Sequence, residues 1–427
     1  MKKKFIQSTF ILLIGGFITK FLGMFIKILM SRKIGLEGIS LYMLVLPTFS
    51  LFMTLGQAGV PLSLSRMVAS KQFKTKNLFF SITFFVVFYN LLLVLLIVLL
   101  APFISQYLLH NSNTYLPLLA VGIVIPFTTI SSLCRSYFIG KERMFPSVLS
   151  NILENVLRLF FLLFGVKHLS RFSTSSVVFF IILFNIVSEI SSTILLLIFL
   201  PKKITFSDVT FQKKYVKEVL HLSFPNISGN LIGNVTYFLE PILFTSILLS
   251  IGGDSTLFLQ NYGVLTGYVF PLYFLPTFFT YAFSQSILSY QTREYEKRHF
   301  SNLRKLFYLQ IFLYFSFSVC LGCIFLIFGK NLLQLLYHTT LGYSYLRILA
   351  PFCFFYYSQS IFSYLYLAMG KTKEIFYTSF FSSVVRILSL VLYLFFGFGI
   401  YAMLFSFLTN IIFIFFFQLY RLHSYLS

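Results

Sequence analysis

The chain has 427 residues, of which 58% are hydrophobic and 10% are charged, and its formal net charge at pH 7 is +22. This composition excludes a soluble domain with a single hydrophobic tail and predicts an all-α polytopic membrane protein. In a soluble protein such a charge would suggest nucleic-acid binding, but in a membrane protein it must first be compared with the rule that cytoplasmic loops are rich in lysine and arginine.

Apolar segments long enough to cross a bilayer alternate with short polar breaks along the whole chain. We expect about twelve transmembrane helices, at residues 8–31, 39–65, 77–100, 115–138, 146–166, 174–200, 219–250, 259–290, 304–328, 343–369, 375–396 and 399–420. The longest break lies at mid-chain. We therefore predict an N-terminal six-helix bundle over 1–200, a cytoplasmic linker over 201–218 and a C-terminal six-helix bundle over 219–427. Because each half has an even number of spans, the two bundles should be related by a pseudo-twofold axis along the membrane normal.

Lysine and arginine are distributed unevenly between the two sides of this topology. The N-terminal tail, the even-numbered breaks and the C-terminal tail hold 23 of the 33 basic residues when Arg135, Arg304 and Lys305 at the adjoining span ends are counted with the breaks. The odd-numbered breaks and their edges hold 6. This distribution predicts a multi-pass protein of the cell membrane with both termini in the cytoplasm. Since topology explains most of the charge, no nucleic-acid partner is expected. The four basic residues that remain inside spans are Lys20, Lys27, Arg158 and Arg386.

The first span carries a polar stripe in an otherwise apolar helix. Its members lie at i, i+4, i+7, i+11 and i+15, which places them on one helical face, and they are Gly16, Lys20, Gly23, Lys27 and Ser31. A lysine near the centre of a span costs about 2.5–3.5 kcal/mol on insertion scales, so such residues usually face water or a partner. Lys20 is central, whereas Lys27 is close enough to the outer end to extend to the interface. The stripe predicts a positively charged face that small residues leave open to a ligand.

The seventh span carries a second stripe, which ends in an acid. Its polar and small residues are Asn226, Asn230, Gly233, Tyr237 and Glu240. Pro241 follows the acid and is expected to loosen the helix there. Two interpretations of Glu240 stay open: a buried acid that is neutral or hydrogen-bonded to Tyr or Asn, or a group that couples transport to H⁺ or Na⁺.

Three further spans contain isolated charges. Glu154 and Arg158 are four residues apart on the fifth span and can neutralise each other. Glu189 on the sixth span can either line a cavity or pack between helices. Arg386 on the eleventh span has no acidic neighbour on its own helix, so it needs an acid from another helix or an anionic ligand.

Several sequence runs resemble the stage V sporulation protein B group. They are TKFLGMFIKILMSRKIGLEGISLYM at 19–43, LPTF at 46–49, LGQAGVP at 55–61, Phe224-Pro225 and YFLEP at 237–241. That group belongs to the multidrug/oligosaccharidyl-lipid/polysaccharide (MOP) exporter superfamily, alongside lipid II and O-antigen flippases. The resemblance implies two six-helix bundles around a central, alternately opened cavity, with Lys20 and Lys27 lining it. This family often has arginine where the present chain has these lysines, and a lysine contacts a diphosphate as a point charge and not as a fork.

The function that the resemblance implies is export of an undecaprenyl-diphosphate-linked sugar, such as a peptidoglycan precursor. Expected partners are this anionic lipid-linked glycan and membrane lipids, for a transporter that acts as a monomer without a cofactor, a metal or catalytic residues. Coupling to H⁺, Na⁺ or the membrane potential stays open, as do two alternatives: a multidrug/cation antiporter, and a non-transporting scaffold in cell-wall or spore-wall assembly. The candidate substrate-binding residues are Lys20, Lys27, Gly16, Gly23, Arg158 and Arg386. The candidate ion-coupling or cavity residues are Glu240, Asn230, Tyr237 and Glu189.

Overall fold

The computed structural model describes residues 2–70, 73–169, 171–200, 210–250, 252 and 255–426. All regular elements in these ranges are helical. Ten helices among the described residues are long and apolar enough to cross a membrane. One of them, Ile14–Ala69, contains the predicted span 39–65 and residues 14–31 of the predicted span 8–31. The predicted span 343–369 is made of shorter helices. The all-α polytopic class is confirmed, and the helices agree with the twelve-span, two-bundle arrangement.

The chain divides into two compact units, Met1–Phe238 (unit 1) and Leu239–Ser427 (unit 2). The boundary lies inside a long helix, α8 (Lys213–Ser250). Most of the predicted linker, 201–209, lies outside the described residues, so the predicted domain limits stay a prediction.

Unit 1 consists of seven complete helices and the first part of α8. They are α1 (Lys2–Gln57), α2 (Val60–Ala69), α3 (Thr75–Phe103), α4 (Tyr115–Gly140), α5 (Met144–Phe160), α6 (Thr174–Leu183) and α7 (Asn185–Ile198). The helix α1 is two helices joined at a kink, because Gly35 has φ 69° and ψ −173°, a conformation open essentially only to glycine. This kink separates the first two predicted spans.

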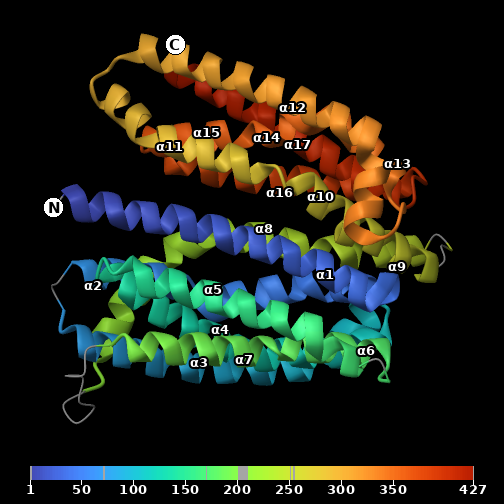
Figure 1. The fold of residues 1–427 in the computed structure, drawn as a ribbon, viewed down its shortest axis with the longest axis horizontal. Coiled ribbons are helices and arrows are strands. Elements are labelled where there is room, and N and C mark those ends of the chain that lie inside the picture. Colours follow the sequence, from blue (N-terminus) through green and yellow to red (C-terminus); the bar gives the residue numbers. More distant parts are fainter. Residues whose placement is uncertain are drawn as a thin grey trace. The chain divides into compact units, whose positions relative to one another are not determined.

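Packing inside unit 1 centres on α4. That helix lies against α1, α2, α3, α6 and α7, and α5 lies between α1 and α7 (Figure 1). A small residue allows close approach where α4 ends, since a Cβ on Gly140 would lie 2.5 Å from the Ser65 carbonyl oxygen of α2. The first part of α8 also belongs here: its Ser223 hydroxyl donates to Ser63 of α2 at 2.9 Å.

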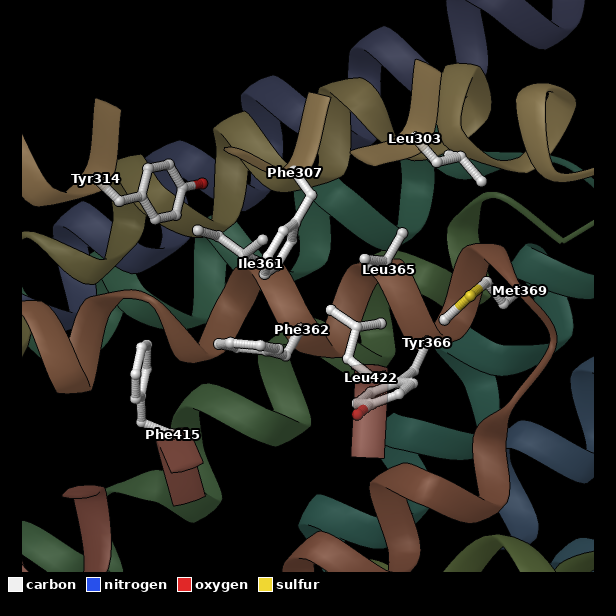
Figure 2. Packing of buried hydrophobic residues seen from close by; sticks show 10 residues of the cluster. All are labelled: Leu303, Phe307, Tyr314, Ile361, Phe362, Leu365, Tyr366, Met369, Phe415 and Leu422. Atoms are coloured by element: carbon white, nitrogen blue, oxygen red, sulfur yellow. The ribbon is translucent and has the colours of Figure 1, made fainter. Parts of the chain in front are cut away.

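Unit 2 holds the end of α8 and nine further helices. They are α9 (Ser255–Gly263), α10 (Phe270–Phe274), α11 (Thr277–Glu296), α12 (Phe300–Tyr337), α13 (Tyr343–Leu349), α14 (Cys353–Tyr357), α15 (Gln359–Ala368), α16 (Thr372–Phe395) and α17 (Tyr401–Leu426), with a π-helical turn at Val264–Val269. Figure 2 shows one core cluster, in which Phe307 of α12, Phe362 of α15 and Phe415 of α17 interlock. Three buried tyrosines donate their hydroxyl groups to backbone carbonyls: Tyr314 to Thr280 at 2.6 Å, Tyr357 to Tyr273 at 2.7 Å and Tyr366 to Gln418 at 2.7 Å.

The expected loosening at Pro241 is wrong. The helix α8 runs without a break from Lys213 to Ser250. The Thr245 hydroxyl donates to the Pro241 carbonyl at 2.8 Å and to the Ile242 carbonyl at 3.1 Å.

Candidate functional site

The two lysines of the α1 stripe lie on an exposed face of the helix. Lys20, Lys27 and Gly16 are exposed and Gly23 is half-buried. Ser31, the last member of the predicted stripe, is instead buried, and its hydroxyl donates to the Ile28 carbonyl at 2.8 Å. Among the described residues, no atom comes within 4 Å of a Cβ built on Gly16 or Gly23. By contrast, a Cβ on the neighbouring Gly15 would collide with the Val148 side chain of α5. The helix therefore packs through one side and presents two ammonium groups and two small residues on another.

Unit 1 contains a closed cluster of four charges contributed by α4, α5 and α7. Arg135 Nη2 donates to Glu154 Oε2 at 2.5 Å and to Glu189 Oε2 at 2.8 Å. Arg158 Nη2 lies 2.6 Å from Glu154 Oε1 and 3.2 Å from Glu189 Oε1. Ser188 accepts from Arg158 Nε at 3.2 Å. Each acid contacts both arginines, so the cluster is neutral as a whole.

The sequence reasoning found three members of this four-charge cluster and missed Arg135. It predicted the Glu154–Arg158 neutralisation, which the structure contains. Arg135 was counted at the edge of a cytoplasmic break, although its side chain is only 17% exposed and lies within α4. The number of charges in the spans could have pointed to Arg135. Glu154 and Glu189 are two buried acids, whereas Arg158 is a single cation, so a second cation was needed nearby.

Unit 2 contains one deep ion pair, between α8 and α16. Arg386 Nε and Nη2 both donate to Glu240 Oε1, at 3.0 and 2.6 Å. The Glu240 side chain is 1% exposed and that of Arg386 is 20% exposed. The Arg386 guanidinium also lies 5.4 Å from the ring centroid of Phe407 on α17. Thus the acidic partner that Arg386 required comes from the seventh span.

The other residues of the seventh-span stripe do not join this pair in the hydrogen bonds observed. Asn230 is exposed and Tyr237 is half-buried, and both belong to unit 1. The side chain of Asn226 lies outside the described residues. Asn234, which the sequence analysis did not select, donates to the Thr54 hydroxyl of α1 at 2.6 Å. In the part of the chain that is described, no three His, Cys, Asp or Glu side chains are grouped to hold a metal ion.

Comparison with known families identifies the group to which these features belong. The sequence model of the family described as polysaccharide biosynthesis protein matches residues 5–252. The chain belongs to this family. A second family model, MatE, matches residues 234–392.

Individual relatives agree with this placement. The chain is 28% identical to stage V sporulation protein B of Bacillus subtilis (strain 168) over 384 residues, which cover 84% of this chain and 71% of that protein. The structure of lipid II flippase MurJ in an inward closed conformation aligns with a TM-score of 0.75 at 16% identity, covering 96% of this chain and 87% of that one. An inward-facing multidrug resistance MATE transporter of the MOP superfamily aligns with a TM-score of 0.74 at 15% identity, covering 95% of each chain. The predicted resemblance is confirmed, and the two structures show that the fold is that of MOP-superfamily transporters.

Proposed function

We propose that this protein is a flippase that moves an undecaprenyl-diphosphate-linked oligosaccharide or peptidoglycan precursor from the cytoplasmic to the outer leaflet by alternating access. The observation that carries the proposal is the exposed stripe of Lys20 and Lys27 on the open face of α1. Charge inside an apolar protein acts at low effective dielectric, so it attracts an anion more strongly than the same charge in water does.

The sign of the deep charge supports an anionic substrate. The four-charge cluster of unit 1 contains two arginines and two glutamates, and the pair in unit 2 contains one of each. Both groups are therefore neutral, and the lysines of the α1 stripe add two positive charges. A diphosphate carries the complementary charge and offers several strong acceptor oxygens for ammonium donors. A cationic drug would be repelled by the same face, which disfavours the multidrug/cation antiporter.

The membrane potential can supply the driving force. Moving one elementary charge across the membrane is worth about 2.3 kcal/mol per 100 mV, so two negative charges gain about 4.6 kcal/mol per 100 mV when they move outward from a negative interior. With the basic breaks and both termini in the cytoplasm, the chain would take its ligand from the side on which lipid-linked precursors are made. It would act as a monomeric transporter and not as an enzyme.

The test is complementation of cells depleted of their lipid II flippase, together with an assay for precursor exposed at the outer surface. Lys20→Arg should retain activity because it keeps the charge. Lys20→Ala removes one charge-assisted contact, worth about 1.5–3 kcal/mol, so transport should fall on the order of tenfold to a hundredfold. Lys20→Glu should abolish transport. Loss of the lysine makes membrane insertion easier by roughly 2–3 kcal/mol, so lower abundance is not the expected cause.

A matched control is available on the same helix. Lys33 is exposed but lies about 220° around α1 from Lys20 at 100° per residue, so Lys33→Glu should leave transport unchanged. Full activity of Lys20→Glu would reject an anionic substrate at this face. A wild-type protein that is abundant in the membrane but exposes no precursor would favour the scaffold role in wall assembly.

A further inference from the structure

The Glu240–Arg386 pair raises the question of what neutralises a buried carboxylate in a transporter. Glu240 is 1% exposed, and a carboxylate so far from water must be protonated, bound to a metal cation or paired with a basic side chain. In this structure Glu240 is paired with a basic side chain. Among the described residues, the hydrogen bonds observed to the Glu240 side chain come from Arg386, through Nε and Nη2.

The guanidinium is held in place from two sides. Its two donors meet one carboxylate oxygen at 3.0 and 2.6 Å, while the Phe407 ring lies 5.4 Å away on α17. A guanidinium over an aromatic face gains a cation–π attraction in addition to its ion pair. Both donors act on the same oxygen, Glu240 Oε1, so the guanidinium already takes the contact that an exchangeable cation would make there.

We propose that Arg386 is the resident cation of Glu240, filling from within the chain the position that an exchangeable cation would otherwise occupy. Arginine keeps its proton at every physiological pH and cannot diffuse away. Unit 2 therefore binds no transported cation at Glu240. Of the two interpretations that the sequence leaves open for Glu240, this proposal rejects ion coupling. The same geometry makes the site latent: without the Arg386 side chain, it would accept a small monovalent cation such as guanidinium or Na⁺.

The test uses the full-length protein purified in detergent without any lipid-linked substrate, so it does not depend on the proposed function. Melting temperatures are compared in sodium, choline and low-millimolar guanidinium salts at one pH and ionic strength. A ligand that binds only the native state raises the melting temperature with its concentration. The wild type should melt at the same temperature in sodium and choline. Arg386→Ala should melt lower, and guanidinium should restore part of the loss in a saturable way.

Three further variants make the interpretation specific. The double variant Glu240→Ala/Arg386→Ala should not respond to any cation, because the carboxylate is gone. Arg421→Ala is the matched control, since it breaks the Glu374–Arg421 pair of α16 and α17. The arginine of that pair is 36% exposed, and Glu374 keeps a hydrogen bond from the Tyr425 hydroxyl at 2.7 Å, so this variant should show no cation response. Arg386→Lys keeps a positive side chain beside Glu240, so its melting temperature should be the same in sodium and in choline, as for the wild type. This variant still tests the proposal if Arg386→Ala does not fold.

Two results would overturn the proposal. One is a sodium-dependent rise in the melting temperature of the wild type that disappears in Glu240→Gln, because a cation would then bind beside Arg386. The other is a folded Arg386→Ala protein that responds to cations no more than the double variant does, because the vacated position would then have no affinity for them.

Discussion

The four-charge cluster of unit 1 allows a quantitative prediction about buried electrostatics. Replacing Arg135 by glutamine removes the contacts of 2.5 and 2.8 Å to Glu154 and Glu189 and leaves two carboxylates facing Arg158 alone. Removing one partner from a buried ion pair costs about 3–5 kcal/mol. Because the Arg135 side chain is 17% exposed, water can solvate part of the deficit, and we expect the lower end, about 3 kcal/mol.

A second substitution should recover part of this loss. In Arg135→Gln/Glu189→Gln the cluster again holds one arginine and one glutamate, so its net charge returns to zero. The double variant should therefore be less destabilised than the sum of the single variants by about 1–3 kcal/mol, the coupling energy typical of residues in one network. Since the chain has no tryptophan, unfolding in mixed detergent is best followed by the helical circular dichroism signal.

The Glu374–Arg421 pair of unit 2 serves as the comparison. Its arginine is 36% exposed, so Arg421→Gln should cost no more than about 1 kcal/mol. If the destabilisation of the double variant equals the sum for Arg135→Gln and Glu189→Gln, the two side chains do not stabilise each other, and the reasoning would be refuted. An Arg421→Gln cost as large as that of Arg135→Gln would equally show that burial is not what sets the magnitude.

Two further predictions concern topology and backbone. In a cysteine-free background, single cysteines that replace Lys217 or Arg298 should resist impermeant thiol reagents in whole cells. A cysteine that replaces Lys330, which lies at the far end of α12 from Arg298, should be labelled. Labelling at position 217 from outside would contradict the predicted orientation. Gly35→Ala should destabilise the protein by about 1–3 kcal/mol in a thermal melt, because Gly35 has a positive φ. Gly16 is helical and nothing lies within 4 Å of a Cβ built there, so Gly16→Ala should keep the melting temperature but reduce transport. A loss of stability in Gly16→Ala as large as that in Gly35→Ala would contradict this prediction.

Features confined to one helix could be predicted from the sequence. The spans follow from uninterrupted apolar runs, and the stripe of Lys20 and Lys27 follows from the 3.6-residue period. The Glu154–Arg158 contact follows from i, i+4 spacing. Each of these depends only on neighbours along the chain, so a regular helix is enough to place the side chains.

Features that depend on how helices pack could not be predicted in this way. Arg135 reaches Glu189 across 54 residues and Arg386 reaches Glu240 across 146, and nothing in either local pattern selects the partner. The sequence nevertheless indicates that a partner is needed, because every buried acid in a membrane needs a cation or a proton.

The separation between Glu240 and Arg386 has a consequence for how the protein is made. Glu154 and Arg158 enter the membrane on one helix and can insert as a neutral pair. Glu240 precedes its partner by 146 residues, and at about 5–20 residues per second the ribosome needs roughly 7–30 s to deliver Arg386. During that interval α8 must carry its carboxyl group protonated or remain beside the insertion machinery. The C-terminal unit can therefore acquire its final ionic state only after α16 has emerged, late in synthesis.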